Sequence, residues 1–297
     1  MITIRSETRQ YFFNDQKGMI QSHGKFNRVF KGYDASYRPV LIKQLLPALS
    51  IDADAVKRFS NEFSFRTEHP NIIPAIDYFV HDKQHYLVRQ WVDGTDLSSK
   101  VHQLKPKEAV RACMAVLQAL NHLHGNNILH SDVQPKNIII GEDGQVYLTD
   151  LGLAIKPGQD KQRQPFNIYY SAPEQVLNRQ ELVNGSTDLF AVGMLLFELL
   201  NRSKPHQHQN PEILMNLMLA APLVNNNRMN ARLFSIIQKA TGKPRFNLPP
   251  THYTGEELST LIKTAQANRY QNAGAFINDL LALSEADLKP KPFYQFW

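Results

Sequence analysis

Through about the first ninety residues, hydrophobic and polar positions alternate in short runs, a spacing typical of β-strands. Polar, turn-forming residues separate these runs, as at 32–36 and 81–84. One segment, 52–66, has a helical spacing instead and must end before Pro70. Two pairs of strands are expected, formed by the segments 28–31 with 39–44 and 76–80 with 85–91. The pattern predicts a small sheet with one helix.

After Asp93-Gly94 the apolar residues follow longer, helical periods. The clearest period lies in 107–124 and is carried by Val110, Cys113, Leu117 and Leu120. Cys113 is therefore expected in a core rather than as a reactive thiol. Apolar runs also flank Asp143-Gly144, a strong hairpin signal. Further helices are expected at 187–201, 211–220, 232–241, 255–267 and 273–283. The second part is thus larger and mainly helical.

Composition narrows the class of protein. The chain has 297 residues, of which 42% are hydrophobic and 20% charged, so it is not disordered and can form one large domain or two lobes. Its 33 Lys and Arg against 27 Asp and Glu give a net charge of +6, but no basic run is present. We therefore expect no nucleic-acid partner. The sequence does not indicate an oligomeric state.

Cellular location is inferred from cysteine usage and from the apolar runs. A single cysteine cannot form an internal disulfide, and it fits a reducing compartment. The best apolar run, 190–200, is shorter than a membrane span and contains Glu198, and the first residues lack the core of a signal peptide. We expect a cytoplasmic protein without a membrane segment.

The most informative stretch runs from His130 to Asn137, between a predicted helix and the predicted 138–149 hairpin. This order brings Asp132, Asn137 and Asp150 to one edge of a short β-ribbon. Phosphoryl transfer needs such a set: Asp132 would accept the proton of an attacking hydroxyl, while Asp150 and the Asn137 amide oxygen would hold Mg²⁺ on the phosphates.

The order His-x-Asp-x₄-Asn, then Asp150-Leu151-Gly152, then Ala172-Pro173-Glu174 resembles the protein kinase family. The segment 268–273, Asn-Arg-Tyr-Gln-Asn-Ala, is similar to the bacterial serine/threonine branch. The resemblance covers about residues 15–283 and implies an α+β, bilobal fold with a small sheet lobe and a larger helical lobe. We expect an N-terminal lobe at 1–92, a C-terminal lobe at 93–283 and a tail at 284–297.

The resemblance assigns roles to single residues. Asp132 would be the catalytic base, Lys43 would neutralise phosphate charge, and Glu62, or alternatively Glu68, would pair with Lys43. The implied cofactors are ATP and Mg²⁺, with Mn²⁺ as an alternative ion, and the metal ligands would be Asn137 and Asp150. The remaining nucleotide contacts would come from Gly24, Val29, Leu41, Gln90, Val92, Asp96 and Ile139. An ion pair between Glu174 and Arg269 would support the substrate platform.

Four departures from the family pattern bear on the mechanism. Ser131 replaces the arginine that would dock a phosphorylated activation segment, and the segment 151–168 contains no Ser, Thr or Tyr. Gln134 and Asn167 replace a lysine and a threonine. We expect both amides to orient Asp132 in a substituted network. Turnover should therefore be slow and independent of activation-segment phosphorylation.

Arg89 stands where the family has an apolar or hydroxyl side chain at the back of the adenine pocket. Either it competes with Lys43 for Glu62, or a shifted register leaves it in solvent.

The sequence predicts an ATP-dependent serine/threonine protein kinase that acts on a protein substrate. Two alternatives remain: a pseudokinase that serves as a binding or scaffold module, and a small-molecule phosphotransferase. The aromatic cluster at 293–297 is expected to dock on the surface of a lobe or to contact a partner.

Overall fold

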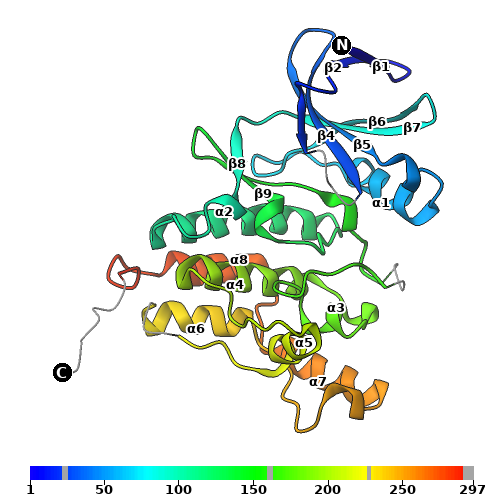
Figure 1. Cartoon of the computed structure of the whole chain (residues 1–297). Coiled ribbons are helices and arrows are strands. Elements are labelled where there is room, and N and C mark those ends of the chain that lie inside the picture. Colours follow the sequence, from blue (N-terminus) through cyan, green and yellow to red (C-terminus); the bar gives the residue numbers. More distant parts are fainter. Residues whose placement is uncertain (22–25, 159–162, 226–228, 290–297) are drawn as a thin grey trace.

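The computed structural model describes residues 1–21, 26–158, 163–225 and 229–289. Its upper part is a curled antiparallel sheet with a single α-helix beside it, and its lower part is a stack of helices (Figure 1). Gly24 and the aromatic cluster at 293–297 lie outside the described residues.

The upper sheet has seven strands, in the order β1-β2-β4-β5-β7-β6, with β3 also paired to β4. The two predicted pairs of strands are β4 with β5 and β6 with β7. The strands are β1 (Ile2–Arg5), β2 (Gln10–Phe13), β3 (Met19–Gln21), β4 (Asn27–Asp34), β5 (Pro39–Leu45), β6 (Ala75–His81) and β7 (Gln84–Gln90).

The β1–β2 hairpin was not predicted, and it gives this sheet a core of its own. Ile4, Tyr11 and Phe13 of the hairpin are buried with residues of β4 to β7. Tyr11 packs on Phe79 of β6 with ring centroids 5.8 Å apart, and its hydroxyl donates to Asp77 at 3.0 Å. The hairpin thus reaches β6, the opposite edge strand, so the sheet curls around a small hydrophobic interior.

The helix of the upper part, α1 (Ala53–Ser64), starts where Asp52 caps it by accepting hydrogen bonds from the amides of Asp54 and Ala55. It buries Ala55, Phe59 and Glu62 against the sheet side of the molecule. Ala55 and Phe59 are apolar, but Glu62 carries a charge. A buried carboxylate requires a partner of opposite charge or a hydrogen-bond donor.

A second sheet, of three strands, lies between the two parts and has the order β10-β9-β8. The predicted Asp-Gly hairpin is β9 (Ile138–Gly141) and β10 (Val146–Leu148), and β8 (Gly94–Asp96) pairs with β9. The segment 130–137 leads into β9 and the segment with Asp150 follows β10, so the hairpin sets the separation of the two segments.

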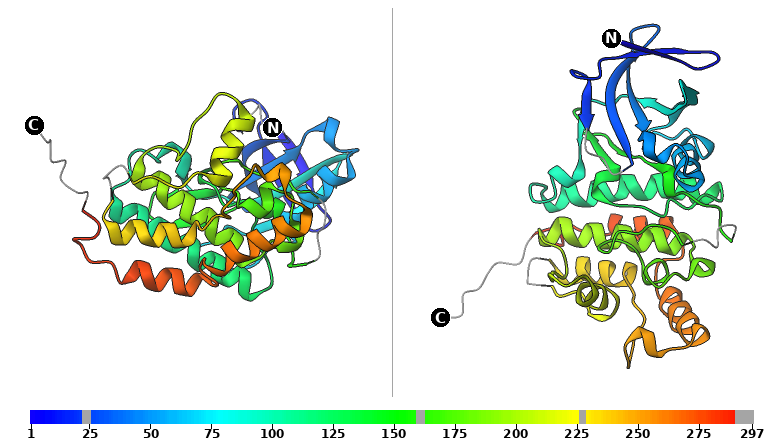
Figure 2. Two further views of the ribbon diagram at one scale, coloured as in Figure 1. Left: turned by 90° about the horizontal axis from the view of Figure 1, so that it is seen from below. Right: turned by 45° about the vertical axis from the view of Figure 1, so that its right-hand side comes forward.

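Helices form the lower part (Figure 2). The long predicted helix is α2, and its Cys113 is fully buried. Almost every residue of α4 is buried, because other helices surround it. The helices are α2 (Pro106–Gly125), α3 (Pro173–Val176), α4 (Gly185–Asn201), α5 (Pro211–Ala220), α6 (Ala231–Ala240), α7 (Gly255–Ala267) and α8 (Ala273–Leu281).

None of the helices in the described part of the chain combines the length and apolar character needed to cross a bilayer.

Candidate active site

The loop that carries Asp132 is anchored by α4. The carboxylate of Asp188 accepts hydrogen bonds from the amide nitrogens of His130 (2.9 Å) and Ser131 (2.8 Å). His124 of α2 also contacts this carboxylate, at 2.8 Å. Ser131 has a left-handed backbone with φ of 64°, a costly conformation for a residue other than glycine. The buried Asp188 therefore stabilises a strained turn next to Asp132.

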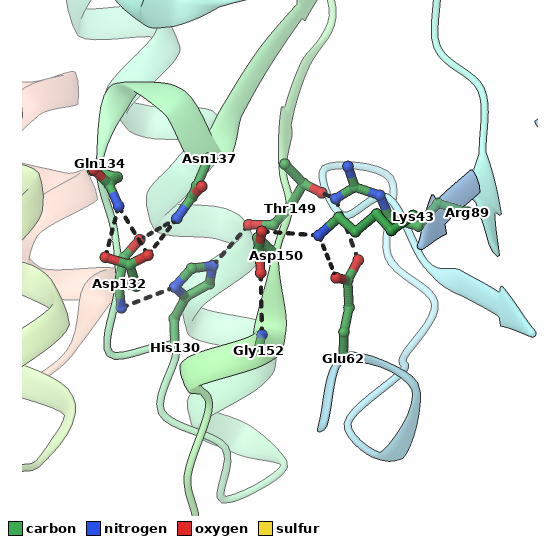
Figure 3. A network of polar contacts seen from close by, with 10 residues as sticks. All are labelled: Lys43, Glu62, Arg89, His130, Asp132, Gln134, Asn137, Thr149, Asp150 and Gly152. Atoms are coloured by element: carbon green, nitrogen blue, oxygen red, sulfur yellow. Dashed lines mark hydrogen bonds and ion pairs between the residues drawn. The ribbon is translucent and has the colours of Figure 1, made fainter. Parts of the chain in front are cut away.

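Amide groups surround the Asp132 carboxylate. The side-chain nitrogen of Gln134 donates to Oδ1 (2.8 Å) and Oδ2 (2.9 Å), and that of Asn137 donates to Oδ2 at 2.8 Å (Figure 3). Burial raises the pKa of Asp132 to about 6, with the charge of Asp150 as a smaller contribution in the same direction. The carboxylate is thus ionised at neutral pH, yet more basic than an exposed aspartate.

Asn167 completes this network from the activation segment. Its Nδ2 donates to Gln134 Oε1 at 2.7 Å, and its Oδ1 accepts from the Tyr169 amide at 3.1 Å. The chain Asn167–Gln134–Asp132 therefore exists as hydrogen bonds, in the arrangement expected for the substituted network.

Lys43 of β5 joins two carboxylates. Its Nζ lies 2.7 Å from Glu62 Oε2 and 2.9 Å from Asp150 Oδ2 (Figure 3). Glu62 is therefore the glutamate that pairs with Lys43, whereas Glu68 is exposed and lies beyond the end of α1. Burial alone would raise the pKa of Asp150, but the charges of Lys43 and Arg89 hold it below its ordinary value.

Arg89 points into the same cluster. Its Nη1 lies 3.3 Å from Glu62 Oε1 and also donates to the hydroxyl of Thr149, and the residue is 7% exposed. The alternative of a shifted register with Arg89 in solvent is wrong.

Of the expected nucleotide contacts, the register of β4 against β5 places Val29 and Leu41 on the same face of the upper sheet as Lys43. Val29 is directly opposite Lys43, and Leu41 lies two residues before it, so all three share one face of the sheet. Ile139 of β9 is half-buried and faces Asp96 of β8 across the small sheet. Gln90 ends β7, and Val92 follows in the connection to β8.

The donor set near Asp150 fits a hard divalent cation. The amide nitrogen of Asn137 is used by Asp132, which leaves its oxygen available, and the Asp150 side chain is 39% exposed. In the described part of the chain, no three His, Cys, Asp or Glu residues gather to hold a metal by themselves. One carboxylate and one amide oxygen suit a Mg²⁺ ion that keeps phosphate and water as its other ligands.

A cavity of about 190 Å³ lies in front of these groups. Its lining includes Lys43, Glu62, Asp132 and Asp150. Side chains that are 107 residues apart in the chain, such as Lys43 and Asp150, therefore meet at one opening.

The expected ion pair between Glu174 and Arg269 is present and fully buried. Arg269 places Nη1 2.8 Å from Glu174 Oε1 and Nη2 3.3 Å from Oε2, and Thr187 donates to Oε1 at 2.8 Å. Removing either charge would leave the other one buried without compensation.

Motif spacing did not reveal two residues of the site. The hydroxyl oxygen of Thr149 accepts a hydrogen bond from Arg89, which lies sixty residues earlier in the sequence. Gln175 donates to the carbonyl of Ser131 at 2.8 Å, so a neutral amide supports the turn. The sequence feature that could have pointed to Gln175 was its position directly after Ala172-Pro173-Glu174.

A strand lobe above a helical lobe, with a Lys–Glu pair and a loop aspartate at their junction, defines the protein kinase class. A family model for the protein kinase domain matches residues 20–283. The chain belongs to the protein kinase family.

Curated relatives support the bacterial branch. The chain is 30% identical over 241 residues to the serine/threonine-protein kinase PrkC of Bacillus subtilis, covering 77% of this chain and 36% of PrkC. It is 29% identical over 271 residues to the probable serine/threonine-protein kinase PknB of Lactococcus lactis, covering 85% of this chain and 42% of that protein. The chain thus spans about two fifths of the length of these relatives.

A solved structure supports the fold. The kinase domain of Mycobacterium tuberculosis PknI matches with a TM-score of 0.65 and 22% identity, covering 91% of this chain and 94% of that one. The predicted bilobal α+β fold and the predicted family are both confirmed.

Proposed function

We propose that this chain transfers the γ-phosphoryl group of ATP to a serine or threonine hydroxyl of a protein substrate. The observation that carries the proposal is the assembly of Lys43, Glu62 and Asp150 in one cleft with Asp132. The serine/threonine class also agrees with the relatives. In the reaction, the bond from the γ-phosphorus to the ADP oxygen breaks as the bond to the substrate oxygen forms. The hydroxyl proton passes to Asp132.

Each charged residue has a part in this reaction. Lys43 would neutralise phosphate charge, and Glu62 would hold Lys43 in position. Mg²⁺, or Mn²⁺, held by Asn137 and Asp150 would offset the negative charge of the phosphates. Asp132 would orient the attacking hydroxyl and accept its proton, which its raised pKa favours.

We further propose slow turnover that does not depend on phosphorylation of the activation segment. Gln134 is uncharged, so the hydrogen-bond donor next to Asp132 brings no cation to the developing charge. Asp188 and Gln175 hold the turn at Ser131 through hydrogen bonds to its backbone, so the turn has support within the chain itself. Tyr170 is 5% exposed, and its hydroxyl donates to Glu198, so it is a poor acceptor of phosphate.

The experiment uses phosphatase-treated protein, Mg²⁺, radiolabelled ATP and a generic basic protein, followed by phosphoamino-acid analysis. We expect label on serine or threonine, and a loss of about 100-fold or more in Asp132→Asn. Asp143→Asn, in the exposed hairpin turn, is the matched control and should keep the wild-type rate.

Other outcomes would replace the proposal. A thermal shift with Mg²⁺ and ATP without transfer would indicate a binding module, and label only on small molecules would indicate a small-molecule phosphotransferase. Phosphotyrosine as the main product would overturn the serine/threonine class. A tenfold or greater rate increase that depends on phosphate at Tyr169 or Tyr170 would contradict phosphorylation independence.

A further inference from the structure

Arg89 is a buried cation on a strand that faces the cleft. It lies on β7 opposite Leu41 of β5, one residue before the strand ends, and its side chain is 9% exposed. A guanidinium in such a place requires partners of opposite charge or strong acceptors.

Its partners come from two other elements. Glu62 belongs to α1, whereas Thr149 immediately precedes Asp150 at the end of β10. One nitrogen, Nη1, contacts both, at 3.3 Å from Glu62 Oε1 and within hydrogen-bond reach of the Thr149 hydroxyl (Figure 3). Arg89 therefore connects β7, α1 and the residue next to Asp150.

Glu62 is held by two cations, one at each carboxylate oxygen. Lys43 contacts Oε2 at 2.7 Å, and Arg89 contacts Oε1 at 3.3 Å. Lys43 is also shared with Asp150, so on its own it would balance only one of two carboxylates. With Arg89 the cluster has two positive and two negative groups, which suits a buried site.

The adjacent residue of α1 makes a second connection. Asn61 Nδ2 donates to the carbonyl of Gly152 at 3.3 Å. Two consecutive residues of α1 are thus connected to the chain on either side of Asp150. Glu62 is connected through Arg89 to Thr149, which precedes Asp150, and Asn61 is hydrogen-bonded to Gly152, which follows it. Ser131, by contrast, is uncharged and cannot pair with a phosphorylated segment.

We propose that Arg89 is a positioning residue that holds Glu62 and α1 against the cleft in place of a phosphorylated activation segment. This inference rests on the proposed kinase function, because positioning Glu62 matters through Lys43. Lys43 can then engage phosphate without releasing α1, since Arg89 retains the other oxygen of Glu62.

The test compares Arg89→Met, Arg89→Lys and Thr149→Val with the wild type. Arg28→Met is the matched control, because Arg28 is an exposed cation of the same sheet, on β4. Two quantities are measured: amide hydrogen exchange of residues 53–64 in the free protein, and kcat and KM for phosphate transfer.

For Arg89→Met we expect exchange in α1 to be about tenfold faster and kcat about tenfold lower, with KM for the protein substrate nearly unchanged. Arg89→Lys keeps the positive charge but places it on a side chain of different shape and reach, so it should restore part of kcat. Thr149→Val should move exchange and kcat in the same direction by a smaller factor. Arg28→Met should match the wild type.

The proposal would be overturned if the amides of α1 in Arg89→Met exchanged at the wild-type rate. It would also be overturned if Arg89→Met had a lower melting temperature but an unchanged kcat below that temperature. If Arg89→Met does not fold, Arg89→Lys and Thr149→Val decide by the same two measurements. If the wild type transfers no phosphate, the kinase proposal fails, whereas the exchange data still test whether Arg89 positions α1.

Discussion

Among single residues, the aspartate that would accept the proton is held by side-chain amides. Gln134 and Asn137 donate to its two oxygens, and Asn167 supports Gln134. Amides fix direction as well as a lysine would, but they bring no charge to the reacting phosphoryl group. Orientation and charge stabilisation are therefore separated in this site.

Gln134→Lys tests that separation. A lysine can donate to Asp132, and it adds a positive charge beside the transferring group. We expect kcat to rise roughly three- to tenfold with little change in KM, as measured by steady-state phosphate transfer. Gln145→Lys, an exposed glutamine of the hairpin turn, should have no effect. An inactive Gln134→Lys protein would argue against the substituted network.

Spacing around a hairpin and a loop was sufficient to predict that Asp132, Asn137 and Asp150 lie together, whereas Lys43 was added to that set by the resemblance to the protein kinase family. The sequence could not decide where Arg89 lies. The partners of Arg89 are 27 and 60 residues away, and only the register of β7 against β5 determines which face it occupies. Side-chain direction in a sheet changes completely with a shift of one residue.

At the level of elements, the β1–β2 hairpin contributes to the core of the upper sheet like a central strand. Ile4 is 1% exposed among aromatic residues of other strands, although it is the fourth residue of the sequence. A segment with such burial is an integral part of the fold.

Ile4→Ala should lower the free energy of unfolding by about 2–4 kcal/mol, the range for truncating a buried aliphatic side chain. Thr3→Ala, on the exposed side of the same strand, is the control and should change it by less than about 0.5 kcal/mol. Urea unfolding measures both. Equal, small effects would mean that the hairpin does not share the core.

The longer elements were predictable, and α5 and α7 have the predicted bounds, because their apolar period extends over several turns. The four-residue strands of the hairpin offer too few positions for a period. Their apolar partners, such as Phe79 of β6, lie far along the chain. The short α3 follows Ala172 and was missed for the same reason.

At the scale of the whole molecule, the helical part contains a half-buried cation whose hydrogen-bond partner is neutral. Lys243 follows α6, and its Nζ donates to the carbonyl of Ala221 at 2.9 Å. Burial lowers the pKa of Lys243 to about 8. Burial and the charge of Lys243 also lower the pKa of the neighbouring His206.

The stability of the protein should therefore depend on pH in the alkaline range. Between pH 8 and 10.5 the folded protein has lost the Lys243 proton while the unfolded chain retains it, so stability rises with pH. Relative to Lys243→Met, the wild type should gain roughly 2–3 kcal/mol across this window, measured by urea unfolding. Lys263→Met, on the exposed side of α7, controls for the loss of a lysine. Parallel curves for wild type and Lys243→Met would contradict the prediction.

The single thiol, Cys113 in the middle of α2, makes it possible to measure how often the helical core opens. Cys113 is fully buried between helices, and burial also raises the pKa of its thiol, so the native protein offers a labelling reagent no thiolate. Modification can occur only when the helical core opens. The rate at which a thiol reagent labels the Cys113 sulfur therefore reports how often the helical core opens. This measurement needs no engineered probe and no enzymatic assay.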